Sequence, residues 1–88
     1  MKAWLVEICI FNRDDEYGNI SNLYTDNKVF KTKDKAEKYL QKLYDDIEAS
    51  KRNRDAFWDF YYKYDNVYPD GSGVVCYNTS KITEIDIL

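Results

Sequence analysis

The sequence of 88 residues contains no histidine, and this absence removes several kinds of active site. Pairs of serine or cysteine with histidine cannot form, and the commonest metal ligand is missing. The two cysteines, Cys9 and Cys76, lack the spacing of a metal or redox motif. Each lies in an apolar run, so both are predicted to be reduced core residues. We therefore expect a protein that is not an enzyme and that uses no metal and no other cofactor.

Turn-forming residues are also scarce, with three glycines and one proline. This scarcity argues against a β-sandwich with many turns and favours a few longer elements. The length fits a single domain over residues 1–88, and the hydrophobic content of 44% is enough for a compact fold rather than a disordered chain.

The sequence has neither a basic excess nor a long apolar run. Its formal net charge of −3 disfavours non-specific binding to nucleic acid or to a membrane surface. No apolar stretch is long enough to span a bilayer, and the first residues lack the apolar region and cleavage site of a signal peptide. We therefore expect a protein of the bacterial cytoplasm that does not bind membranes.

The most regular pattern lies within residues 30–54, where apolar residues recur at the spacing of one face of an α-helix. These residues are Ala36, Tyr39, Leu40, Leu43, Tyr44 and Ile47. Thr32 and Asp34 are both candidate N-caps. Basic residues near position 52 would complement the negative end of the helix dipole, so we predict that the helix continues to about residue 52.

Strands are predicted on both sides of this helix. Residues 3–11 are the strongest strand candidate and are expected at the centre of the sheet, with Trp4, Val6, Ile8 and Ile10 facing the helix. Further strands are expected at residues 20–24, 29–30, 74–77 and 82–88, with turns at 25–27 and 78–81. This order predicts an α+β fold, in which a small, mostly antiparallel β-sheet of about four to five strands has one long helix packed on one face.

The segment over residues 56–64 is ambiguous because two patterns overlap in it. Phe57, Phe60, Tyr61 and Tyr64 have helical spacing, whereas Trp58, Phe60, Tyr62 and Tyr64 alternate as in a strand. The density of aromatic residues favours a strand. We therefore predict a strand that forms a hairpin with residues 74–77.

Two short segments resemble binding motifs but fail on spacing. Asp14, Asp15 and Glu16 form an acidic patch without the alternating oxygen ligands of a calcium loop. The glycine-containing segment 70–73 resembles a phosphate-binding loop but lacks the lysine and the following helix. Both are interpreted as loops.

The aromatic content exceeds what one small core can bury, since the chain has nine tyrosines, four phenylalanines and two tryptophans. Tyrosine and tryptophan are frequent at interfaces. The candidate binding residues on the exposed, tyrosine-rich side of the sheet are Tyr62, Tyr64, Tyr68, Tyr77 and Trp58, and those at the helix start are Lys33 and Lys35. The alternative is that the tyrosines rim the core with their hydroxyls in water and that the lysines form a solvated face.

The opening residues 1–4 and the strand-to-helix junction over residues 29–40 resemble small proteins encoded by phages and prophages of Firmicutes. The similarity covers roughly the first half of the chain. It implies an inhibitor of bacterial defence, such as an anti-CRISPR protein, that blocks a larger bacterial protein such as a defence nuclease complex. It assigns a role to no particular residue.

Two hypotheses about function follow. The first is a non-enzymatic protein-binding module, in its specific form such an inhibitor. The alternative is a single-stranded nucleic-acid or nucleotide binder that uses the aromatic sheet face and the lysine-rich helix start. The acidic net charge opposes this alternative.

Overall fold

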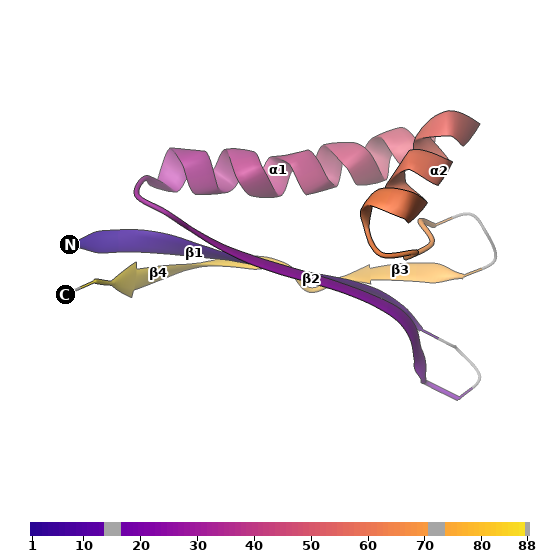
Figure 1. Ribbon diagram of the computed structural model, residues 1–88, viewed down its shortest axis with the longest axis horizontal. Coiled ribbons are helices and arrows are strands. Elements are labelled where there is room, and N and C mark those ends of the chain that lie inside the picture. Colours follow the sequence, from indigo (N-terminus) through magenta and orange to yellow (C-terminus); the bar gives the residue numbers. More distant parts are fainter. Residues whose placement is uncertain (14–16, 71–73, 88) are drawn as a thin grey trace.

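The computed structural model describes residues 1–13, 17–70 and 74–87. They form a four-stranded antiparallel sheet and two α-helices, and both helices lie on the same face of the sheet (Figure 1). The predicted α+β class is confirmed. The prediction of a single long helix is wrong, because the described residues form two.

The strand β1 (Lys2–Arg13) is central, as predicted, and it pairs on one side with β2 (Ile20–Phe30). Its other side pairs with two strands in succession. The strand β4 (Lys81–Asp86) lies along the first half of β1, and β3 (Val75–Asn78) lies along its end. Between them, the Thr79 N–H donates to the Cys9 carbonyl at 2.9 Å. The predicted turn at 78–81 therefore corresponds to the break between β3 and β4 along one edge of the sheet. Because these two strands follow one another along β1, the four-stranded sheet is three strands wide.

The strand β2 is continuous where the sequence predicted two short strands and a turn at 25–27. Thr25, Asp26 and Asn27 stand opposite Cys9, Ile8 and Glu7 in an unbroken register. The pairing with β1 gives this polar segment the hydrogen bonds of an antiparallel ladder along one of its sides. The turn prediction is wrong because it rested on residue type alone, and the pairing with a distant strand is not visible in the local sequence.

The helix α1 (Lys33–Ser50) begins where the pattern placed it, and the Thr32 side chain accepts a hydrogen bond from the Lys35 N–H at 3.3 Å. It ends at Ser50 with Lys51 as its C-cap, close to the predicted end at about residue 52. Asn53 takes an extended conformation and caps a second helix, accepting from the Ala56 N–H at 2.7 Å. An asparagine at this position favours a new helix start over the continuation of the first one.

That second helix, α2 (Arg54–Lys63), occupies the segment for which we predicted a strand. The strand prediction is wrong, and so is the predicted hairpin with residues 74–77. Asp55 lies in the first turn of α2 and Lys63 in its last turn, which complements the helix dipole at both ends. With the Asn53 cap, these local signals favour the helical spacing over the alternating one.

The core lies between the sheet and the two helices. Its buried apolar side chains are Val6, Ile8, Ile10, Ala36, Leu40, Leu43, Phe60, Tyr64 and Val67. The predicted contact between the helix stripe and the inner face of β1 is thereby confirmed, except that Tyr44 is 40% exposed. Both cysteines are only partly buried. Cys76 packs against this core as predicted, whereas Cys9 lies on the opposite face of the sheet, where the core prediction is wrong.

A buried asparagine near the end of β1 ties the segment after α2 to the sheet. The Asn12 side chain is fully buried. Its Oδ1 accepts from the Tyr68 N–H at 2.7 Å, and its Nδ2 donates to the Tyr68 carbonyl at 2.8 Å and to the Val75 carbonyl at 3.2 Å. These three bonds satisfy polar groups that would otherwise be buried without partners.

Two earlier interpretations fall largely or wholly on residues that are not described. The acidic patch at 14–16 lies outside the described residues, and so does most of the glycine-containing segment at 70–73. Within the described part of the chain, neither helix combines the length and apolar character needed to cross a membrane.

We predict that Asn12→Ala lowers the free energy of unfolding by about 3 kcal/mol, because it leaves the N–H and the carbonyl of Tyr68 without their partners. Asn22→Ala serves as the control, since Asn22 contributes one longer bond to Asn12 at 3.4 Å, and about 1 kcal/mol or less is expected. Urea unfolding followed by circular dichroism measures both. Equal losses for the two variants would contradict the role assigned to Asn12.

Candidate functional site

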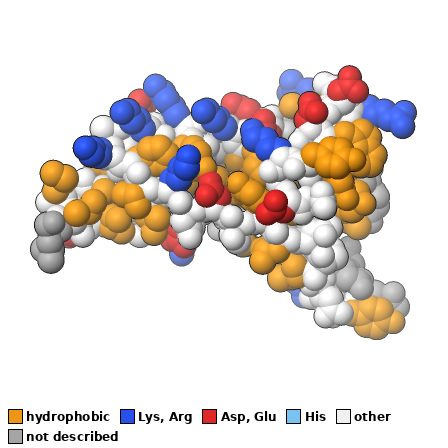
Figure 2. Space-filling view, viewed as in Figure 1, with side chains coloured by type: hydrophobic (Ala, Val, Ile, Leu, Met, Phe, Trp, Pro, Cys, Tyr) orange, Lys and Arg blue, Asp and Glu red, His pale blue; other side chains and the backbone are white. Residues whose placement is uncertain are grey.

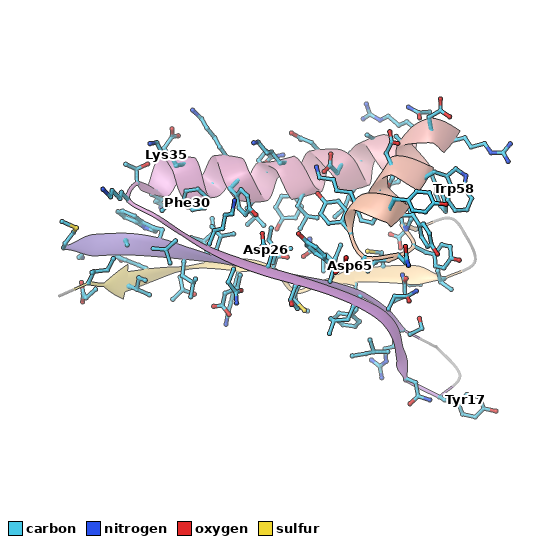
Figure 3. All side chains as sticks on the ribbon, viewed as in Figure 1. Tyr17, Asp26, Phe30, Lys35, Trp58 and Asp65 are labelled. Carbon is cyan, nitrogen blue, oxygen red and sulfur yellow. The ribbon has the colours of Figure 1, made fainter. Side chains whose placement is uncertain are left out.

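Five aromatic side chains form a continuous cluster on and beside α2. We call this cluster the α2 aromatic surface, and it consists of Phe57, Trp58, Tyr61, Tyr62 and Tyr68. Trp58 is 41% exposed and Tyr62 is 73% exposed. Figure 2 shows hydrophobic side chains gathered over α2, and Figure 3 shows Trp58 on the side of α2 that faces away from α1.

The rings of this surface support one another. The Trp58 ring meets Phe57 and Tyr61 edge to face, with centroid separations of 5.1 and 5.5 Å. Tyr61 also contacts Tyr68, with centroids 4.6 Å apart, and a hydrogen bond between these two side chains raises the pKa of Tyr61 above its usual value. Edge-to-face and tilted arrangements of this kind are the favourable ones for aromatic pairs. The exposed rings are therefore held in place by half-buried ones.

The opposite side of α2 anchors the helix in the core. Phe60 and Tyr64 are one helical turn apart, and their ring centroids are separated by 4.6 Å. Tyr64 also meets Tyr24 of β2 edge to face, with centroids 5.1 Å apart. Because α2 buries this face, the α2 aromatic surface is directed away from the core.

The carboxylate of Asp46 links α1 to the end of α2. It accepts a hydrogen bond from the Tyr64 hydroxyl at 2.5 Å and from the Lys63 ammonium at 2.8 Å. Asp46 lies near the carboxyl end of α1, where an acidic residue is unfavourable with respect to the helix dipole. The two donors, one in the last turn of α2 and one at its C-cap, offset this penalty and link the two helices.

A similar contact joins α1 to β2 near the middle of the molecule. The Tyr39 hydroxyl donates a hydrogen bond to Asp26, which points from β2 towards α1 (Figure 3). Burial, together with the bond to Asp26, raises the pKa of Tyr39 to about 12. Burial and Asp46 likewise raise the pKa of Tyr64 well above its usual value. Both tyrosines are hydrogen-bond donors at neutral pH, which suits a structural role and not that of a base.

A groove of about 300 Å³ lies between the two helices, and its lining comprises Asp46, Ala49, Ala56, Asp59, Phe60 and Lys63. Asp46 and Lys63 bond to each other in its wall. Within residues 1–13, 17–70 and 74–87, every buried side-chain nitrogen or oxygen has a hydrogen-bond partner. The same residues contain no group of three or more acidic or cysteine side chains that could hold a metal ion. Asp59, the other acidic residue of the lining, is exposed on α2.

The structure brings together only part of the predicted binding set. Trp58, Tyr62 and Tyr68 meet in the α2 aromatic surface, but Tyr64 is only 4% exposed and belongs to the core. Tyr77 lies in β3 and stacks on Phe11, on the sheet face that points away from the helices. The expectation that these side chains share an exposed side of the sheet is therefore wrong, because residues 56–64 form a helix.

The two predicted lysines lie at the other end of the molecule. Lys33 and Lys35 are in the first turn of α1, and Figure 3 shows Lys35 far from Trp58. Lys33 approaches Glu37 at 3.9 Å on the exposed surface, where an ion pair contributes little to stability. The predicted set also lacked Phe57 and Tyr61, although their spacing of four residues is a helical signal.

Comparison of the chain with known protein families, with curated proteins and with solved structures finds no match.

We predict that stability falls as the pH rises above about 10. The pKa of Tyr39 is about 12 in the folded protein and about 10 in an unfolded chain, so the folded state holds this proton more tightly. Its contribution is fully present below pH 10 and is lost as the pH rises towards 12. Urea unfolding at pH 8, 10 and 11 should show a smaller loss for Tyr39→Phe than for the unmodified chain. Tyr62→Phe is the control, and an identical pH dependence in all three proteins would contradict the assignment.

Proposed function

We propose that this chain is a non-enzymatic protein-binding module that engages its partner through the α2 aromatic surface. The observation that carries the proposal is that an exposed tryptophan and an exposed tyrosine, Trp58 and Tyr62, pack against half-buried aromatic rings. Residues that dominate the energy of protein interfaces are enriched in tryptophan and tyrosine. Held in place before binding, such rings lose little conformational freedom when a partner covers them.

The charges around this surface fit a protein better than a nucleic acid. Asp55 and Asp59 are exposed on α2 itself, while Arg52 and Arg54 lie at its start. A polar rim with both signs of charge around an apolar centre is typical of a protein interface. The phosphate backbone would require a predominantly basic rim.

The resemblance to small phage proteins supplies a specific form of the proposal. In this form the partner is a larger bacterial protein, such as a nuclease complex of a defence system, and binding inhibits it. The support for this form is the sequence resemblance alone, whereas the support for a binding module is the geometry of α2.

We predict that Trp58→Ala and Tyr62→Ala each weaken binding by about 2 kcal/mol, or roughly thirtyfold, because each removes an anchor from the centre of the surface. The control is Tyr44→Ala, since Tyr44 lies on α1 and is 40% exposed, nearly the same as Trp58. Tagged chains would first capture a partner from bacterial lysates, and calorimetry with the purified partner would then give the affinities. A partner that binds the Trp58 and Tyr62 variants as tightly as the control would refute the proposal.

A single-stranded nucleic-acid binder remains the second candidate, because Arg52 and Arg54 lie at the start of the helix whose exposed rings could stack on bases. The first proposal predicts no binding of labelled single-stranded DNA or RNA at about 0.1 M salt. The second predicts binding that weakens as salt is added. In the double variant Arg52→Ala, Arg54→Ala, the slope of the logarithm of the binding constant against the logarithm of the salt concentration should be smaller by about two. Fluorescence anisotropy over a range of salt concentrations separates the two.

A further inference from the structure

The face of the sheet that points away from the helices is uncovered in the described residues (Figure 1). Side chains alternate between the two faces along each strand, and the register places the odd-numbered residues of β1 on this face with their neighbours from the other strands. We call it the outer sheet face. Its larger apolar members are Leu5, Phe11, Leu23, Val29, Tyr77 and Ile85.

Two of these apolar side chains are exposed, and the other four are partly exposed. Leu23 is 50% exposed and Val29 is 54% exposed. The rings of Phe11 and Tyr77 are stacked, with centroids 5.4 Å apart and an interplanar angle of 13°. The register places Leu5, Val29 and Ile85 towards one end of the face and Phe11, Leu23 and Tyr77 at the other, with Glu7, Asn27, Thr25 and Lys81 between them. Exposed apolar patches on a protein surface mark sites that another molecule covers.

The size of the outer sheet face fits an interface between two copies of a small protein. The strand β1 has 12 residues, which corresponds to a length of about 40 Å, and three strands side by side are about 14 Å wide. Two such faces together provide at least about 1,100 Å² in projection. Stable interfaces begin at about 1,200 Å² of total accessible surface. The accessible surface of a face is larger than its projected area, because side chains make the surface uneven.

The charges on this face also fit a second copy. Near its middle, Glu7 stands opposite Lys81 in the register between β1 and β4. These two charges balance each other, and Arg13 at the end of β1 adds one positive charge, so the face has no large excess of either sign that would drive two copies apart. A strongly acidic or strongly basic partner would find no complementary excess of charge here.

We propose that the outer sheet face binds the same face of a second copy of this chain. The two sheets pack face to face about 10 Å apart, as sheets do in a β-sandwich, and the same patch serves on both copies. Both pairs of helices remain on the outside of this dimer. The α2 aromatic surface therefore plays no part in the contact.

Analytical ultracentrifugation of the full chain, from about 1 µM to 1 mM, tests this proposal. We expect a reversible monomer–dimer equilibrium. Leu23→Lys and Val29→Lys should each raise the dissociation constant at least about tenfold, because each places an unpaired charge in an apolar contact. The two residues are about 20 Å apart along β2, so the double variant should show at least about a hundredfold increase.

Tyr44→Lys is the matched control, since it adds the same charge at an exposed aromatic residue of α1, and it should leave the dimer intact. Trp58→Ala should also leave it intact. Circular dichroism of each variant establishes that it is folded, as expected for changes at side chains that are half exposed.

Three outcomes would overturn the proposal. One is a chain that stays monomeric throughout the concentration range. Another is a dimer that persists unchanged in the double lysine variant, as pairing of two β2 edges would allow. The third is a dimer disrupted by Trp58→Ala or Tyr44→Lys as strongly as by the lysines on β2.

Discussion

The arrangement of this molecule depends on the amide side chain of Asn12. It lies fully buried near the end of the central strand and is bonded to both the N–H and the carbonyl of Tyr68. A buried amide with all its bonds formed fixes the geometry around it, because any displacement leaves polar groups without partners. Tyr68 in turn contacts Tyr61 of α2. The sheet thereby holds the far end of the aromatic surface in place.

The two surfaces proposed for binding lie on different layers of the fold. The α2 aromatic surface belongs to the helical layer, and the outer sheet face is on the reverse side of the sheet (Figure 1). A dimer formed through the sheets would therefore present two α2 aromatic surfaces to solvent. Two linked sites raise the avidity for a partner that itself has two sites, without any new contact.

The parts of the fold that follow from local patterns could be predicted from the sequence. The apolar stripe of α1 and the central position of β1 belong to this class, because periodicity and apolar content determine them. The strand β2 does not, since Asp26 and Asn27 are stabilised in it by pairing with β1. Residues 56–64 fit both the helical and the alternating spacing of apolar residues, and it is the cap at Asn53 that favours the helix. The predicted site was dispersed for that reason: an incorrect strand placed Tyr62 and Tyr64 on the wrong element, although Trp58, Tyr62 and Tyr68 do meet.

Hydrogen exchange at the Tyr68 amide tests most directly whether the sheet holds the segment after α2. This N–H donates to the buried Oδ1 of Asn12, so it can exchange only when the contact opens. If Asn12 holds the segment, nuclear magnetic resonance should show the Tyr68 amide exchanging as slowly as that of the buried residue Ile10 of β1, at the rate set by global unfolding. Exchange of Tyr68 at the rate of an exposed loop amide would contradict this account.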